Sequence, residues 1–175
     1  MLLSLPWLGS QIGHADFSVL SGNVVLDRGH VRINAELDLN LGRGPTEALL
    51  AGIPLMLTVH TEIYKLRFKL WKNKKQSWQY PYALNYHRLS GRFSIEDQLS
   101  GEMKTFGTLV DALNFLSLVH ISETMPIPIA NNDRLHVRLK VQLIRSKLPA
   151  PLHLISIFFR DWRNASDWYR WEIVH

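Results

Sequence analysis

The chain has 175 residues, of which 46% are apolar and 20% charged, a composition typical of one globular domain with a real core. It contains no cysteine, which excludes disulfides, thiolate metal sites and a cysteine nucleophile. The net charge of +5 permits attraction to anionic lipid or nucleic acid, but so moderate an excess is equally typical of a soluble basic domain, and we do not favour nucleic acid as a partner.

The N-terminus resembles the end of an export signal. The first eight residues are mostly apolar, and Gly13, His14 and Ala15 have the small–x–small pattern of a signal-peptidase site. A complete signal peptide starts with a basic region, and none precedes Leu2. We therefore interpret residues 1–15 as the remnant of a signal peptide whose true start lies upstream, with an apolar first strand or a frayed terminus as the alternative. Residues 16–175 are then one β-rich domain.

The first half of that domain predicts strands. Residues 16–26 form a strand that turns at 27–30, and residues 31–41 alternate strictly between apolar and polar side chains, which indicates one buried and one wet face. Pro45 is suited to the first turn of a short helix over residues 46–51. Residues 55–71 form a long strand whose apolar phase switches near Ile63 and Tyr64, which predicts a β-bulge or a change of sheet.

The second half predicts further strands and one clear helix. Lysines at 72–75 predict a turn, and residues 78–89 return as a strand in which Pro81 indicates an edge or a bulge. After a turn at 90–91, a strand runs through Phe93 and Ile95. Leucines at helical spacing predict a helix over residues 106–119, and alternation predicts a strand over 135–143. Closing strands are expected over 152–162 and 168–174.

This element order predicts the fold class. About seven alternating strands joined mostly by hairpin turns favour a mainly β protein, an antiparallel β-sandwich with one packed helix. The alternative is an α+β fold in which a strongly curved antiparallel sheet wraps around the helix.

Two groups of residues are candidate binding surfaces. A basic run without acids places Lys65, Arg67 and Lys69 on one strand face, where they either contact phosphates or lipid headgroups or guard a strand edge against pairing. Residues 160–171 hold three tryptophans and three arginines, which either brace a corner of the fold or bind a ligand or peptide. The candidate binding residues of this segment are Arg160, Asp161, Trp162, Asp167, Trp168, Tyr169, Arg170 and Trp171.

The sequence contains no motif for catalysis or metal binding that we recognise. It has no Gly-x-Ser-x-Gly elbow and no glycine-rich phosphate loop, and its eight histidines form no metal-binding spacing. Only His60 and Glu62 place two potential ligands on one strand face. We therefore predict no catalytic residue, no metal and no cofactor.

From residue 15 onward the chain resembles the DUF4390 family of bacterial exported proteins of unknown function. The resemblance is carried by residues 31–41, 47–55, 82–89, 106–116 and 148–151, and most specifically by residues 166–171. It implies periplasmic localisation and a link to a neighbouring membrane sensor histidine kinase of the nitrogen-regulation type. The family has no established catalytic residues to transfer.

Three hypotheses of function follow. The first is a non-enzymatic periplasmic domain that binds a partner protein through a strand edge and the C-terminal aromatic–arginine cluster. The second is a carrier or sensor of a small apolar ligand held between the sheet and the helix. The third is a hydrolase without a recognisable motif.

Overall fold

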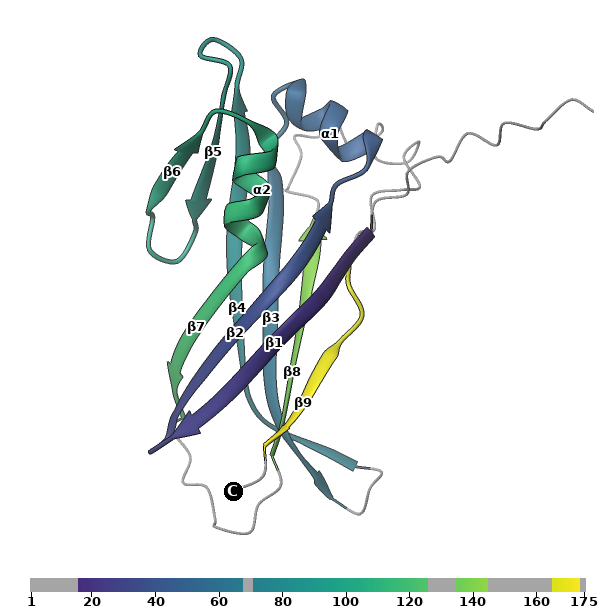
Figure 1. Cartoon of the computed structure of the whole chain (residues 1–175), viewed down its shortest axis with the longest axis vertical. Coiled ribbons are helices and arrows are strands. Elements are labelled where there is room, and N and C mark those ends of the chain that lie inside the picture. Colours follow the sequence, from purple (N-terminus) through teal and green to yellow (C-terminus); the bar gives the residue numbers. More distant parts are fainter. Residues whose placement is uncertain (1–15, 68–70, 126–134, 145–164, 174–175) are drawn as a thin grey trace, which may run out of the picture.

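The computed structural model describes residues 16–67, 71–125, 135–144 and 165–173, which form nine strands and two helices (Figure 1). The elements in chain order are β1 (Asp16–Asp27), β2 (His30–Asn40), α1 (Arg43–Leu50), β3 (Leu55–Arg67), β4 (Trp71–His87), β5 (Arg92–Asp97), β6 (Met103–Phe106), α2 (Leu109–Ser117), β7 (Leu118–Thr124), β8 (Leu135–Ile144) and β9 (Tyr169–Ile173).

The strands form two antiparallel sheets that face each other. The small sheet has the order β1-β2-β7, and the large sheet has the order β6-β5-β4-β3-β8-β9. In Figure 1 the small sheet crosses in front of the large one, with β1 beside β9 at one side. At the other side, the Tyr80 hydroxyl of β4 donates to Glu123 Oε1 of β7 over 2.9 Å, which joins the two sheets. The predicted antiparallel sandwich with a packed helix is confirmed.

Alternation in the first hairpin produces one face of the core. In β2 the side chains of Val31, Ile33 and Leu37 are buried, and the polar residues between them are exposed. β1 pairs with β2 antiparallel over its whole length, with a register shift between Val19 and Ser21. The buried positions of the small sheet pack on Leu57, Val141 and other inward residues of the large sheet in one continuous core.

The phase switch in β3 does mark a bulge. Ile63 faces the core, and Tyr64 is also buried, on the opposite face of the large sheet. Between β3 and β4 the register shifts at this point, because Ile63 pairs with Gln76 but Tyr64 pairs with Lys74. The additional residue, Lys75, is therefore on β4, and the β3–β8 register continues unbroken.

Two predictions for β4 have different outcomes. The turn predicted at 72–75 is wrong, because β3 ends at Arg67 and β4 already starts at Trp71. The end of β3 and the start of β4 project beyond the sandwich (Figure 1), so packing against the core does not impose a pattern on them. Pro81 does lie at a local edge, because β5 pairs only with residues 82–87 and the Pro81 carbonyl accepts from the Gln98 amide. The missing N–H therefore costs no bond to β3.

The predicted helix over 106–119 is shorter than expected. α2 starts after Thr108, whose hydroxyl accepts from the Asp111 amide over 3.1 Å, and ends at Ser117. Residues on both sides belong to strands β6 and β7, which the sequence analysis missed. Leu118, Val119 and Ile121 fit helical spacing and strand alternation almost equally well, so the boundary was misplaced.

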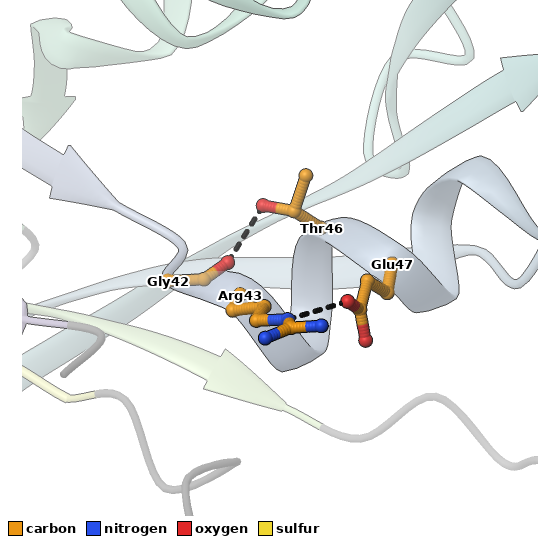
Figure 2. Close-up of polar contacts among 4 residues, drawn as sticks. All are labelled: Gly42, Arg43, Thr46 and Glu47. Atoms are coloured by element: carbon orange, nitrogen blue, oxygen red, sulfur yellow. Dashed lines mark hydrogen bonds and ion pairs between the residues drawn. The ribbon is translucent and has the colours of Figure 1, made fainter. Parts of the chain in front are cut away.

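The short helix α1 connects the two sheets. It starts earlier than predicted, at Arg43, directly after Gly42, which adopts a positive φ of 67°. Figure 2 shows the Thr46 hydroxyl donating to the Gly42 carbonyl over 2.7 Å and Arg43 Nε bonded to Glu47 Oε1 over 2.7 Å. Neither helix in the described part of the chain is long and apolar enough to cross a membrane.

Candidate functional site

The structure divides the predicted C-terminal cluster between two faces of the large sheet. Arg160, Asp161 and Trp162 lie outside the described residues. Because successive strand residues point to opposite faces, the β9 pairing with β8 turns Tyr169 and Trp171 toward the core and Arg170 toward solvent.

Trp171 joins the large sheet to the edge of the small one. Its indole Nε1 donates to the Gly22 carbonyl of β1 over 2.9 Å, and its ring packs on Tyr169 with centroids 4.9 Å apart. A Cβ on Gly22 would lie 2.6 Å from the Trp171 ring, so only glycine permits this approach. We infer that Trp171 closes the sandwich on this side.

Ser166 fixes the chain just before β9. Its side chain is buried, and its hydroxyl accepts from the Val141 amide over 3.0 Å and donates to the Asp167 carbonyl. The Ser166 amide donates to the Val141 carbonyl over 2.9 Å. These bonds hold Asp167 and Trp168 against β8, with the Asp167 side chain exposed.

The outward residues meet side chains of β3 and β8. The Arg138 guanidinium lies 4.1 Å from the centre of the Trp168 ring and 5.5 Å from that of Tyr64. Arg138 Nε donates to Glu62 Oε2 over 2.8 Å, and a second Arg138 nitrogen bonds the same oxygen. We call this surface the aromatic–arginine face: Tyr64, Arg138, Lys140, Trp168 and Arg170.

Sequence reasoning missed Arg138 as a member of the site. Its signal was present, because His136, Arg138 and Lys140 occupy the wet face of a strand that alternates cleanly. What the sequence did not show is that β8 lies beside β9, which brings Lys140 Nζ to 5.0 Å from the centre of the Trp168 ring.

The predicted basic face is not part of this surface. Lys65 lies in β3 next to Tyr64 in sequence, so its side chain points to the opposite face of the large sheet. Arg67 is the last residue of β3, and Lys69 lies outside the described residues. Whether these residues bind anions or guard the β3–β4 hairpin stays a prediction.

A hollow of about 280 Å³ lies between α2, the β5–β6 hairpin and β7. Its apolar wall includes Phe115 and Leu118, which stay 37% and 58% exposed. Lys104 Nζ lies 4.4 Å from the centre of the Phe115 ring at the rim. The residues around the hollow are Tyr82, Ile95, Asp97, Glu102, Lys104, Phe115, Leu116, Leu118, Val119 and His120.

Two other arrangements do not form a chemical site. Ser94 Oγ lies 2.8 Å from His87 Nε2, the spacing of a nucleophile and a base, but Ser94 is 1% exposed and out of reach of a substrate. His60 and Glu62 do share a face of β3, yet Glu62 is held by Arg138, and burial, reinforced by Lys140, lowers the pKa of His60. Within the described residues no three His, Asp or Glu side chains are grouped to hold a metal ion.

The contact between the sheets at Tyr80 predicts a dependence of stability on pH. Burial, and next the Glu123 carboxylate that accepts its proton, raise the pKa of the Tyr80 hydroxyl above its ordinary value. The unfolded chain then loses this proton at lower pH than the folded one. The stabilisation is present below about pH 10, the ordinary tyrosine value, and declines as the pH rises above it.

We therefore expect the free energy of unfolding to fall between about pH 9 and pH 11, and to fall less steeply in Tyr80→Phe. Urea titrations followed by far-UV circular dichroism measure both slopes. Tyr86→Phe is the matched control, because Tyr86 stacks on Phe93 on the same strand face. Equal slopes in wild type and Tyr80→Phe would contradict the assignment.

The comparisons with known proteins give a family without an assigned activity. The profile of the family described as a domain of unknown function, DUF4390, matches residues 14–172, nearly the whole chain. No curated protein and no solved structure matches the chain.

Proposed function

The chain belongs to the DUF4390 family, and on this premise we propose that it is an exported, non-enzymatic domain that binds a partner protein. The proposed location is the periplasm, as the apolar N-terminus and the Gly13-His14-Ala15 pattern favour. The proposed contact surface consists of Lys140, Trp168 and Arg170 of the aromatic–arginine face, together with the exposed Asp167, and the buried Tyr64 and largely buried Arg138 lie beneath it.

One observation carries this proposal: the Arg138 guanidinium lies 4.1 Å from the centre of the Trp168 ring. Arg138 is bonded to Glu62, and both residues belong to strands of the large sheet. The Trp168 indole therefore packs on a side chain that the sheet holds in place. Tryptophan and arginine are enriched among residues that carry binding energy, and a pre-ordered side chain loses little entropy when a partner binds. Exposed Arg170 adds a second charged contact beside it.

The partner that we propose is the periplasmic sensor region of a membrane histidine kinase. This choice follows from the family resemblance rather than from the surface. The surface itself requires a partner with carboxylates opposite Lys140 and Arg170 and an apolar patch opposite Trp168. An anionic lipid surface offers the same charge, and we treat it as an alternative outcome of the test.

Trp168→Ala and Arg170→Ala are each expected to weaken binding to the purified sensor region of the neighbouring kinase by about tenfold or more. Biolayer interferometry measures the dissociation constants, and far-UV circular dichroism in urea verifies that the variants are folded. Arg32→Ala, an exposed position on the outer face of the small sheet, is the matched control and keeps full affinity.

Two results would contradict the proposal in different ways. If wild type does not bind the sensor region, the kinase is not the partner. If both variants bind as well as wild type, the contact surface is elsewhere. Binding of wild type to anionic vesicles, lost in Arg170→Ala, would instead assign the face to lipid.

A carrier of a small apolar ligand is the second candidate, and the hollow beside α2 is the observation in its favour. At about 280 Å³ it is close to the lower limit of known ligand pockets, which range over about 300–1,000 Å³. Native mass spectrometry of protein from a periplasmic extract distinguishes the two candidates, since a bound ligand adds its mass to that of the chain.

A further inference from the structure

Strand β7 presents a free edge beside the hollow. It pairs with β2 on one side, and no strand in the described ranges pairs with its other side. The register shows which backbone groups face outward. The Met125 amide donates to the Gly29 carbonyl over 2.8 Å, and the amide and carbonyl of successive residues point to opposite sides of an antiparallel strand. The residues whose N–H and C=O point away from β2 are therefore Leu118, His120, Ser122 and Thr124.

In the described residues this edge lacks three devices that often prevent pairing with another chain, namely lysine, proline and a bulge. Its seven residues include no lysine and no proline, and its pairing with β2 has no register shift. The neighbouring edge of β4, which no described strand pairs with before residue 82, differs because Pro81 lies on it. Of two edges on the same side of the sandwich, β7 is the one left open to a further strand.

The hollow lies next to the start of this edge and offers an anchor point. Ile95, Leu116 and Val119 form a buried apolar wall, and the exposed Leu118 lies at its mouth. The volume of about 280 Å³ suits one or two large side chains better than a whole carried ligand. An extended segment that pairs with β7 would project alternate side chains toward the interior, and one of them would reach the hollow.

The charges at the rim select the segment. Asp97 and Glu102 are negative, whereas Lys104 is the one cation around the hollow and is engaged with the Phe115 ring. The rim is therefore net negative on a chain whose total charge is +5. A lysine or arginine beside the apolar anchor of the incoming segment would complement it.

A second copy of the chain fits this edge poorly. Pairing of β7 with β7 of another copy would place a whole sandwich beside the edge. The β5–β6 hairpin stands beside the start of β7 (Figure 1) and occupies part of that space. A single extended segment is only one strand wide and needs less of that space.

We propose that β7 and the hollow bind an extended segment of a partner protein by strand addition, with an apolar anchor side chain flanked by a basic residue. This inference rests on the proposed partner-binding function and names a second contact, separate from the aromatic–arginine face. The outward N–H and C=O groups of His120, Ser122 and Thr124 supply the affinity, and the hollow with its acidic rim supplies the selectivity.

A single substitution tests the edge without breaking the sheet. Ser122→Pro removes an N–H that points away from β2, so the β2–β7 ladder keeps all its bonds while the edge loses a donor. Ser122→Ala is the matched control, and urea unfolding verifies that both variants are folded. The probe is a phage-displayed library of random peptides about twelve residues long, enough to span β7.

Wild type and Ser122→Ala are expected to enrich peptides with alternating apolar residues and a lysine or arginine beside one of them. Ser122→Pro is expected to reduce their affinity by about tenfold or more, measured by fluorescence anisotropy on synthetic copies. Asp97→Asn combined with Glu102→Gln is expected to remove the preference for a basic residue.

Three results would overturn the inference. The first is that wild type selects no peptide consensus that Ser122→Pro does not also select. The second is a consensus of acidic or helix-forming peptides. The third is dimerisation of wild type that Ser122→Pro abolishes, which would assign the edge to a second copy. Trp168→Ala should keep the peptide preference, so failure here is separable from failure of the kinase-binding proposal.

Discussion

Replacing Trp171 by alanine is expected to lower the free energy of unfolding by about 3 kcal/mol. This value is the lower end of the range for removal of a large aromatic side chain, because Trp171 is only partly buried. The substitution removes the ring that packs between β9 and β1 and the 2.9 Å bond from Nε1 to the Gly22 carbonyl. The carbonyl then depends on water for a partner. Urea unfolding followed by far-UV circular dichroism measures the change without relying on tryptophan fluorescence.

Trp168→Ala is the matched control for this prediction. Trp168 precedes β9, points to the outer surface and contacts Arg138 and Lys140 rather than the core. We expect it to change the free energy of unfolding by about 1 kcal/mol or less, as for an exposed cation–π contact. If the two alanine variants were equally destabilised, the division of the cluster into a structural and an exposed half would be wrong.

Much of the fold was predictable because one physical signal dominates it. Strict alternation over residues 31–41 and 135–143 requires one buried and one wet face, and β2 and β8 occupy nearly those ranges. The phase switch at Ile63 and Tyr64 likewise indicated a bulge, although the sequence could not show that the additional residue belongs to β4.

The failures occur where that signal is weak. β4 starts at Trp71, in the part of the β3–β4 hairpin that projects beyond the sandwich (Figure 1), so the run of lysines over 72–75 looked like a turn. β7 follows α2 with no residue between them, and its apolar positions also fit the helix. The role of Gly22 could not be seen in the sequence. A side chain there would collide with the ring of Trp171, which is 149 positions away in sequence.

The candidate site was predictable only in part, for a similar reason. Composition identified the tryptophans and arginines of residues 160–171, but alternation in β9 sends Trp171 inward and leaves Trp168 outside. The arginine that supports Trp168 comes from β8, and the acid that holds it comes from β3. Strand order, which a single sequence does not reveal, brings these three residues together.

Arg138→Ala is expected to lower the free energy of unfolding by about 2 kcal/mol, and to weaken partner binding as strongly as Trp168→Ala. The side chains of Arg138 and Glu62 are each only 18% exposed, so removal of the arginine takes two hydrogen bonds from a largely buried carboxylate. The Trp168 ring also loses the guanidinium 4.1 Å from its centre. Urea unfolding and biolayer interferometry on the same preparation measure the two effects.

A double-mutant cycle separates the ion pair from the stacking. Glu62→Ala removes the carboxylate but leaves Arg138 next to Trp168, so we expect Glu62→Ala to destabilise the protein while retaining more binding than Arg138→Ala. The double variant is expected to be about 1 kcal/mol or more less destabilised than the sum of the single variants, because it keeps neither charge of the pair without the other. Additive effects would show that the pair is not coupled. If Arg138→Ala binds as well as wild type, Trp168 does not need the contact with Arg138 in order to bind. The rigidity of the aromatic–arginine face would then not be what a partner recognises.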